Sequence, residues 1–423
     1  MKTFTLTLST LLSLAAAQTP TLPELIASQP DLSILLDALS IVPDFATLLT
    51  GLSDITILAP TNTAFEKLLA AGLNAENQAV STRDPDGVST LLSYHVINGT
   101  VTSADFSNIP TYTNTIFNQS YSIFDVIRTN VTTGQNVGYV LDGETPKFLS
   151  GELRSSTVVQ ADIQVIPGVT IHKIDDVLTI PLNLSDTLTR LPQLGTSAIL
   201  GALDTAGAID RVDANGESSQ QTLDIIPDIT VFVPVDAAFV AAASAFEGAS
   251  LDTLRSVLTY HVIQGSVVFA SAITNTSVPS VQGNELTLTV GADGTVYVDT
   301  ARVILPNVVL SNGVAHFIDA VLNPATGDVD RSALNPAAPV VQFPGATPLG
   351  SAVPFTQSAI TPSTTISIPA LATTAQFVPT GNATVTTAST TASATLPVFS
   401  GGAGALKNGA GGVLAVLGAA MLL

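Results

Sequence analysis

The chain has 423 residues, enough for two or three domains, and its 33 acidic and 13 basic residues give a formal net charge of -20. A field of this sign repels nucleic-acid phosphates and anionic membrane surfaces, which argues against nucleic acid as a partner. The absence of cysteine excludes disulfides, thiolate metal sites and cysteine nucleophiles, so any extracellular domain must be held together by its core alone.

The first 17 residues are predicted to form a secretory signal peptide. Lys2 precedes an apolar run that ends at Leu14, and Ala15 and Ala17 stand in the A-x-A arrangement before Gln18. On this route the chain would meet the N-glycosylation machinery, which acts at N-x-S/T sequons. Six sequons are present, at Asn98, Asn118, Asn130, Asn183, Asn275 and Asn382.

Helices followed by a buried strand are expected at the start of the mature chain. Apolar residues between positions 32 and 52 recur at spacings of three and four, which predicts helices facing a core, with Gly51 as a stop signal. A strand is predicted at "ITIL", residues 55–58, and a helix after the next proline, with Asn62 as its N-cap.

The same landmarks occur twice, in the same order. "DITILAPTNTAF" at 54–65 matches "DITVFVPVDAAF" at 228–239, where Asp236 takes the place of Asn62. The tetrapeptide "YHVI" occurs at 94–97 and again at 260–263, and "GVTIHKIDDVL" at 168–178 matches "GVAHFIDAVL" at 313–322. The chain is therefore predicted to be a tandem duplication, whose first copy carries extra residues, mostly after its YHVI.

The later half of each copy is predicted to be rich in strands. In the second copy "ELTLTV" and "VYVD" flank "GADG" at 291–294, which predicts a hairpin and an α+β unit. Gly168 stands four residues before His172, whereas Gly313 stands three before His316. One extra residue must be absorbed in the first copy, and a bulge is the expected form.

The three repeated motifs resemble those of the fasciclin-like (FAS1) domain family. The resemblance implies two such domains, at about 21–181 and 184–324, each a β-sheet wedge flanked by helices. It also implies a secreted or lipid-anchored surface protein that mediates adhesion or matrix contact. The residues that carry the family motifs are Tyr94, His95, His172, Asp175, Tyr260, His261, His316 and Asp319.

Two interpretations of the four histidines are open from the sequence. Each could act as a base beside Asp175 or Asp319, or a pair in one domain could hold a metal ion. The alternative is structural, because each histidine lies between apolar neighbours in a strand-like or strand-edge context, where a neutral imidazole can pair with buried backbone groups. No nucleophile elbow, zinc-binding helix motif or P-loop is present, so no catalytic residue, cofactor or metal site is predicted.

The C-terminal part is predicted to be a stalk with an anchor signal. Residues 332–406 contain no charged side chain and are rich in Ser, Thr and Pro, which predicts a disordered O-glycosylated stalk at 325–400. The apolar run at 413–423 is shorter than the roughly 20 residues of a membrane span. Residues 401–423 are therefore predicted to be a glycosylphosphatidylinositol (GPI) attachment propeptide, with Ser400 or Gly401 as the acceptor, and a single-pass tail is the alternative.

The combination of signal, two domains, stalk and anchor signal resembles the fungal members of the family. It predicts a non-enzymatic adhesion or cell-wall interaction protein on the outer face of the plasma membrane, with transfer to the cell wall left open. The expected partner is an unidentified surface or wall protein or polysaccharide, and the membrane is contacted through the lipid. A carbohydrate-binding or wall-polymer-binding structural protein is the alternative, and a hydrolase or metal enzyme the last.

Overall fold

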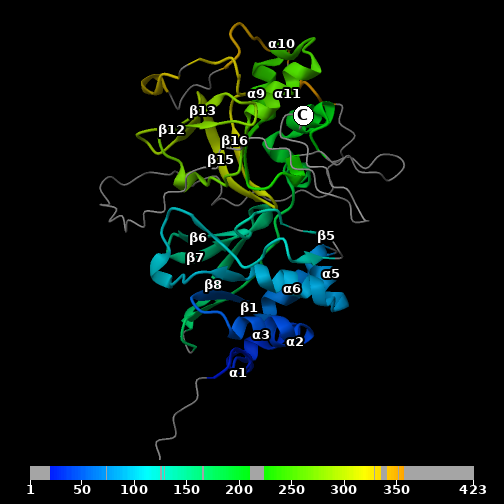
Figure 1. Cartoon of the computed structure of the whole chain (residues 1–423), viewed down its shortest axis with the longest axis vertical. Helices are drawn as coiled ribbons and strands as arrows, with labels where there is room; N and C mark the ends of the chain where they lie inside the picture. Colours follow the sequence, from blue (N-terminus) through cyan, green and yellow to red (C-terminus); the bar gives the residue numbers. More distant parts are fainter. Residues whose placement is uncertain are drawn as a thin grey trace, which may run out of the picture.

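Two α+β domains are stacked along the long axis of the molecule in the computed structural model (Figure 1). The structure describes residues 20–72, 74–123, 126–127, 129–163, 166–209, 223–327, 329–334, 341–350 and 352–356. Several predicted features lie outside the described residues: the signal peptide, the stalk beyond residue 356, the sequon at Asn382, and the anchor residues Ser400 and Gly401. In Figure 1 helices α1 to α3 lie at the outer end of the first domain and α9 to α11 at that of the second, so the sheets meet in the middle.

The helices of the first domain follow the predicted pattern of apolar residues. Pro43 opens a new helix after Val42, and Gly51 ends it as predicted. Among the described residues no single helix is long and apolar enough to cross a membrane. One pair of segments, Pro30–Ile41 and Pro43–Thr50, has the length and apolar composition of a membrane span when the two are taken together, but they are bent by 105° relative to each other. The helices are α1 (Leu22–Ala27), α2 (Ser33–Ile41), α3 (Pro43–Thr50), α4 (Asn62–Ala70), α5 (Ala75–Thr82) and α6 (Pro85–Tyr94).

The sheet of the first domain has the strand order β2-β1-β9-β8-β7-β6-β3. Only β1 and β9 run parallel within it, and all residues of these two strands are buried. The strands are β1 (Ile55–Pro60), β2 (Val96–Asn98), β3 (Thr111–Asn114), β6 (Asn136–Asp142), β7 (Thr145–Leu149), β8 (Ser155–Ile163) and β9 (Val169–Ile174). A separate hairpin is formed by β4 (Ser122–Ile123) and β5 (Val126–Ile127).

The second domain repeats this sheet strand for strand, in the order β11-β10-β16-β15-β14-β13-β12, so the predicted tandem pair of α+β domains is confirmed. Its strands are β10 (Ile229–Pro234), β11 (Val262–Gln264), β12 (Thr276–Pro279), β13 (Glu285–Val290), β14 (Val296–Val298), β15 (Ala301–Leu310) and β16 (Gly313–Ile318). Its helices are α7 (Leu184–Thr189), α8 (Ser197–Ala206), α9 (Asp236–Ala241), α10 (Ala243–Phe246) and α11 (Leu251–Tyr260). Short 3-10 turns are η1 (Pro30–Leu32), η2 (Ser103–Asp105), η3 (Gly151–Leu153), η4 (Pro192–Leu194), η5 (Leu223–Ile225), η6 (Ala270–Ala272) and η7 (Arg331–Ala333).

Asn62 and Asp236 do not cap their own helices, contrary to the prediction. Thr61 is the N-cap of α4 and accepts a hydrogen bond from the Ala64 amide, so Asn62 is the first helical residue. The Oδ1 atom of Asn62 instead accepts from the Ile34 amide at 2.9 Å, in the first turn of α2. Asp236 Oδ1 accepts from the Ala198 amide at 2.7 Å, in the first turn of α8. Each side chain therefore caps a neighbouring helix and fixes that helix against its own.

The extra residue before His172 does not form a bulge between β1 and β9. His172 pairs with Leu58 as His316 pairs with Phe232, and neither parallel register is interrupted. Gly168 lies before β9 with φ +74°, whereas Gly313 is the first residue of β16. The loop in front of β9 therefore absorbs the extra residue, where glycine tolerates the left-handed backbone.

The predicted stalk begins later than residue 325, because residues 341–350 and 352–356 pack on the second domain. Phe343 and Phe355 lie 5.4 and 5.7 Å from Phe246 between ring centroids. The Asn323 amide donates to Gln342 Oε1 at 3.2 Å. We call residues 341–356 the strap. The composition of the region predicted a stalk, but two aromatic side chains bury enough apolar surface to hold this part of it.

Substitution of Phe355 by Ala is expected to lower the free energy of unfolding of the second domain by about 1 to 3 kcal/mol, because a partly buried ring is lost from the aromatic cluster. Urea unfolding of the purified chain measures this loss. Leu349→Ala is the matched control, because Leu349 lies in the same strap and is 46% exposed. Equal stabilities of both variants would show that the strap does not contribute to the domain.

Candidate functional site

His95 and His261, the histidines of the two YHVI motifs, are buried and make the same two hydrogen bonds. Nδ1 of His95 donates to the Leu91 carbonyl at 2.8 Å, and Nε2 accepts from the Leu178 amide at 2.9 Å. In the second domain the partners of His261 are the Val257 carbonyl at 2.7 Å and the Leu322 amide at 2.9 Å. Both ring nitrogens are engaged with the backbone, so neither imidazole offers a lone pair to a metal ion or a substrate.

These two histidines stand where a helix ends and a strand begins, which is the strand-edge context that the sequence predicted. His95 follows the last residue of α6 and His261 the last residue of α11, and β2 and β11 begin one residue later. The last carbonyls of a helix have no partner within it, and each imidazole satisfies one of them. Burial lowers the pKa of both histidines to about 4, which keeps them neutral at neutral pH.

His172 and His316 lie in β9 and β16, in the strand context that the sequence predicted. Their Nε2 atoms donate to the carbonyls of Val101 and Val268, both at 2.8 Å. Their Nδ1 atoms accept longer bonds, of 3.4 and 3.3 Å, from the amides of Asp162 and Asn307. Burial lowers the pKa of both, to about 4 for His316. These two imidazoles are also neutral and bound to the backbone.

The motif tyrosines are also tied to the backbone. Tyr94 donates to the Asn136 carbonyl at 2.9 Å, and Tyr260 donates to the Glu285 carbonyl and to Asp299 Oδ2, both at 2.9 Å. Burial raises the pKa of both tyrosines. Each phenol therefore stays protonated and acts as a hydrogen-bond donor.

Asp175 and Asp319, the motif carboxylates, hold the ends of equivalent strands. Asp175 Oδ1 accepts from the Thr157 amide at 2.6 Å, and Asp319 Oδ1 accepts from the Arg302 amide at 2.7 Å. Within the part of the chain that the structure describes, no group of three His, Asp or Glu side chains is placed to hold a metal ion.

The two domains are docked through a segment that the first copy has in addition, between β3 and β6. Gln135 is fully buried, and its Nε2 donates to the carbonyls of Leu310 and Ser311 in the second domain at 3.1 and 3.2 Å. The Thr132 amide donates to Asp228 Oδ1 at 2.8 Å, and the Thr132 hydroxyl donates to Asp228 Oδ2. These bonds end on Leu310, the last residue of β15, on Ser311 in the turn that follows, and on Asp228, immediately before β10.

An aromatic stack lies beside these hydrogen bonds. The rings of Tyr112 in β3 and Phe269 in the second domain are parallel, with centroids 3.9 Å apart and an interplanar angle of 2°. Arg190 of the second domain also forms an ion pair with Glu152 in η3 of the first domain, at 2.5 Å. Polar, aromatic and ionic contacts together hold the pair.

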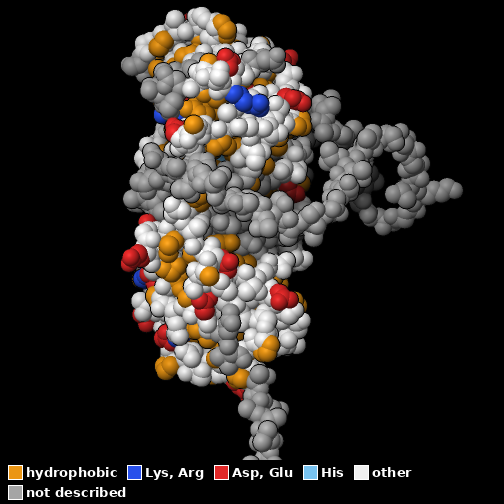
Figure 2. Space-filling view, turned by 90° about the vertical axis from the view of Figure 1, so that its left-hand side faces the viewer, with side chains coloured by type: hydrophobic (Ala, Val, Ile, Leu, Met, Phe, Trp, Pro, Cys, Tyr) orange, Lys and Arg blue, Asp and Glu red, His pale blue; other side chains and the backbone are white. Residues whose placement is uncertain are grey.

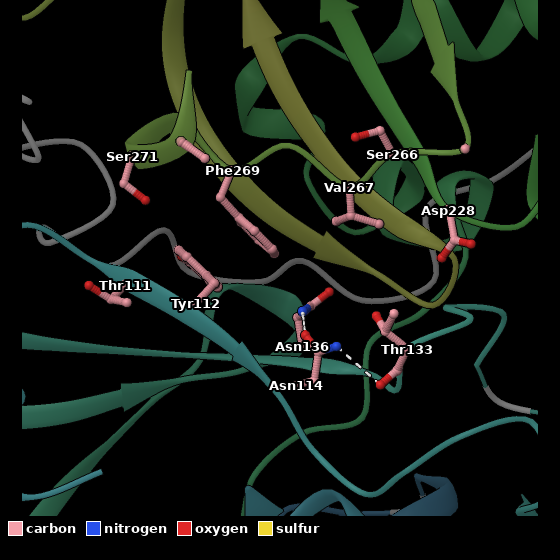
Figure 3. Close-up of a pocket in the computed structure, with 12 residues that line it drawn as sticks. Thr111, Tyr112, Asn114, Thr133, Asn136, Asp228, Ser266, Val267, Phe269 and Ser271 are labelled. Atoms are coloured by element: carbon pink, nitrogen blue, oxygen red, sulfur yellow. Dashed lines mark hydrogen bonds between the residues drawn. The ribbon is translucent and has the colours of Figure 1, made fainter. Parts of the chain in front are cut away.

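A pocket of about 570 Å³ opens next to the aromatic stack, between the domains (Figure 3). The first domain contributes Thr111, Tyr112, Asn114, Thr133 and Asn136 to its wall. The second domain contributes Asp228, Gly265, Ser266, Val267, Phe269, Ser271 and Ala272. The pocket exists only where the domains are docked, since both supply its lining.

Figure 2 shows charged side chains scattered over one face of both domains without forming a continuous patch. Acidic side chains are interspersed with neutral polar and apolar ones, as the excess of Asp and Glu in the sequence leads one to expect. The described residues on this face form no large basic or apolar area in Figure 2, and the pocket is the more specific feature.

The sequence analysis predicted neither the interface nor the pocket, although it named Asn130 as a sequon and Asp228 within a repeated motif. Gln135, Thr132 and Asn136 belong to no motif, and an isolated Gln or Asn gives no signal in a single sequence. One feature of the sequence could have indicated the interface: the first copy is longer than the second after its YHVI motif. Extra residues inserted into one copy of a repeated domain often form a contact that the other copy does not make.

Five of the six sequons fall within the described residues, and Asn130 differs from the others. Asn98, Asn118 and Asn275 are exposed, and Asn183 is the half-buried N-cap of α7. The Asn130 side chain lies at the domain interface, where Nδ2 donates to the Ile225 carbonyl of the second domain and Oδ1 accepts from Gln119, both at 2.5 Å. The atom that would carry the glycan is thus the one that faces the other domain.

Asn130 is expected to carry a glycan much less often than Asn275, because a sugar on its Nδ2 would lie against the second domain. Asn275 is the internal control, since its side chain is exposed and only its Oδ1 is engaged, by the Val290 amide. Glycopeptide mass spectrometry of the secreted chain, with enzymatic removal of N-glycans in heavy-oxygen water, measures both occupancies. Full occupancy of Asn130 would mean that the docked arrangement is not the secreted one.

The buried neutral histidines predict a loss of stability in mild acid. The folded pKa of His95, His261 and His316 is about 4, below the ordinary value of 6.5, so the unfolded chain binds more protons than the folded chain between these two limits. The free energy of unfolding therefore falls as pH falls from 6.5 towards 4, and each histidine contributes up to about 1.4 kcal/mol per pH unit. Urea unfolding at several pH values measures the slope.

His261→Gln removes one of these titrating groups and is expected to reduce that slope by about one proton. The comparison of slopes separates the histidine from the carboxylates, which titrate in both forms. An unchanged slope would show that His261 is not held neutral in the folded chain.

Comparisons with known proteins show which family this chain resembles. The model of the Fasciclin domain matches residues 30–181 and 195–324. A fasciclin-like arabinogalactan protein of Arthroderma benhamiae is 29% identical over 82% of this chain and 76% of its own length, and one of Phaeosphaeria nodorum is 29% identical over 76% and 93%. A solved FAS1 domain pair from the insect cell adhesion molecule Fasciclin I aligns over 69% of this chain and 97% of its own, with a TM-score of 0.32 and 18% identity. The chain therefore belongs to the Fasciclin domain family and carries two tandem copies of the domain.

Proposed function

We propose that this protein is a non-enzymatic adhesion protein of the cell surface, which contacts a wall or matrix component through its docked pair of Fasciclin domains. The observation that carries the proposal is the way the motif residues are used. All four histidines hold the backbone with both ring nitrogens, and the repeated motifs thus build two copies of one scaffold. Two copies of one scaffold, with exposed loops and a pocket at their junction, provide surfaces that can bind a wall or matrix component.

The surface location is proposed from the sequence and from the names of the relatives. Fungal relatives are named fasciclin-like arabinogalactan proteins, which suggests an extracellular glycoprotein. The signal peptide at 1–17, the Ser/Thr-rich region after the strap and an anchor at Ser400 or Gly401 form a consistent route to a lipid-anchored surface protein. The region after residue 356 would then hold the domain pair away from the membrane.

A structural protein that binds a carbohydrate or wall polymer is the second candidate function. The pocket between the domains favours it, because its lining combines amide, hydroxyl, carboxylate and aromatic groups. A hydrolase or metal enzyme finds no support in the four histidines, whose nitrogens are occupied.

Deletion of residues 357–395 is expected to weaken attachment of expressing cells to a surface or to each other, because an extended chain reaches about 3 Å per residue. The deletion keeps both domains, the strap and Ser400. Cell attachment is measured at equal surface density, and release by a phosphatidylinositol-specific phospholipase verifies the anchor in both forms. Replacement of the same residues by a Pro-rich linker of equal length is the matched control for reach, because such a linker is also extended, at about 3.1 Å per residue. Full attachment by the deleted form would contradict a spacer role.

A further inference from the structure

We propose that the pocket between the two domains binds an uncharged, hydroxyl-rich saccharide unit of a surface polysaccharide. This inference rests on the proposed function and deepens it by naming the chemical class of the ligand. Pocket size agrees with such a ligand, because sites for small molecules have volumes of about 300 to 1,000 Å³ and this one has about 570 Å³. Thr133, Ser266 and Ser271 are exposed at its rim, so a chain end can enter from solvent.

The first argument is a buried acceptor in the pocket wall. Asn136 is 5% exposed, and its Nδ2 donates to Asn114 Oδ1 at 2.8 Å. Asn114 in turn donates to the Thr133 carbonyl at 3.1 Å, which fixes the orientation of both amides. Asn136 Oδ1 accepts no hydrogen bond from the described residues, and Figure 3 shows it directed towards the second domain. A buried acceptor without a donor is energetically unfavourable, and a ligand hydroxyl that reached Asn136 Oδ1 would supply the missing hydrogen bond.

The charge of the pocket lining limits the chemical class of the ligand further. Asp228 is the only charged side chain among the lining residues, and it already accepts two hydrogen bonds from Thr132. Phosphates and uronic acids would meet a carboxylate and no cation, in a chain of net charge -20. A purely apolar ligand would leave Asn136 and the remaining lone pairs of Asp228 unpaired. An uncharged ligand rich in O–H donors satisfies both groups.

The aromatic stack indicates how such a ligand would be held. The faces of Tyr112 and Phe269 cover each other at 3.9 Å, so a sugar ring cannot stack between them. The ring edges and Val267 provide apolar surface for the C–H groups of a sugar, and the polar side chains bind its hydroxyls. Because the polar groups come from both domains, binding also joins the two domains.

The test measures the binding of short oligosaccharides to the full chain by isothermal titration calorimetry. The probes are neutral oligosaccharides of glucose, mannose, galactose and N-acetylglucosamine, and an oligosaccharide of galacturonic acid represents the anionic class. At least one neutral probe is expected to bind, and the anionic probe is not. Ser271→Trp, which fills the pocket from an exposed position, and Asn136→Leu, which removes the acceptor, are each expected to weaken binding at least about tenfold.

Ser40→Trp is the matched control, because Ser40 is exposed on α2, away from the pocket, and this variant should bind as the parent chain does. Circular dichroism establishes that each variant is folded, and the exposed Ser271 keeps the test decisive should Asn136→Leu fail to fold. Binding of no neutral probe, binding of the anionic probe alone, or unchanged binding by Ser271→Trp would overturn the inference. Cell attachment measured with the same variants distinguishes this inference from the proposed adhesion function. Attachment without saccharide binding would refute the inference and would not contradict the adhesion function.

Discussion

Each domain depends on one buried imidazole that joins a helix to the end of the domain. His95 binds a carbonyl of α6 with one nitrogen and the Leu178 amide, beyond β9, with the other. Leu91 and Leu178 are far apart in sequence, and between them lies almost the whole sheet. A neutral histidine is the one side chain that can donate and accept through a rigid ring with this span. Protonation of the acceptor nitrogen would place its N–H against the N–H of Leu178 and break this hydrogen bond. The bond that joins the helix to the end of the domain therefore also makes the stability of the domain sensitive to acid.

The fold of the chain results from duplication of this domain, and the pocket between the domains results from a segment that only the first copy has. The two sheets have the same strand order, and their helix-capping side chains Asn62 and Asp236 are used in the same way. The segment between β3 and β6 has no counterpart in the second copy, and it supplies Thr132 and Gln135 to the domain contact. The added segment gives the pair a defined geometry and, with it, a pocket.

The sequence could predict whatever is repeated or periodic. The helical spacing before Gly51, the buried strand at residues 55–58 and the hairpin at residues 291–294 follow from local rules, and the repeated order of motifs gave the number of domains. His95 lies at the strand edge that its apolar neighbours indicate, but those neighbours do not reveal that a helix also ends at this residue. Phe343 and Phe355 were assigned to a stalk because composition averages over a region, whereas two rings suffice to fix a segment on a surface. Gln135 and Asn136 could not be found, because their importance comes from a second domain that local sequence does not place.

Docking changes how the two domains can contribute to adhesion. Two modules on a flexible linker would bind separate ligands, and their joint strength would depend on effective concentration. Here the buried Gln135, the Tyr112–Phe269 stack and the Glu152–Arg190 ion pair hold the domains as one body, so little conformational freedom remains between them to be lost on binding. Surfaces that face each other across the contact are unavailable to partners, and Asn130 lies among them. A ligand can therefore reach only the surfaces outside this contact, and a ligand that entered the pocket at the junction would meet both domains at once.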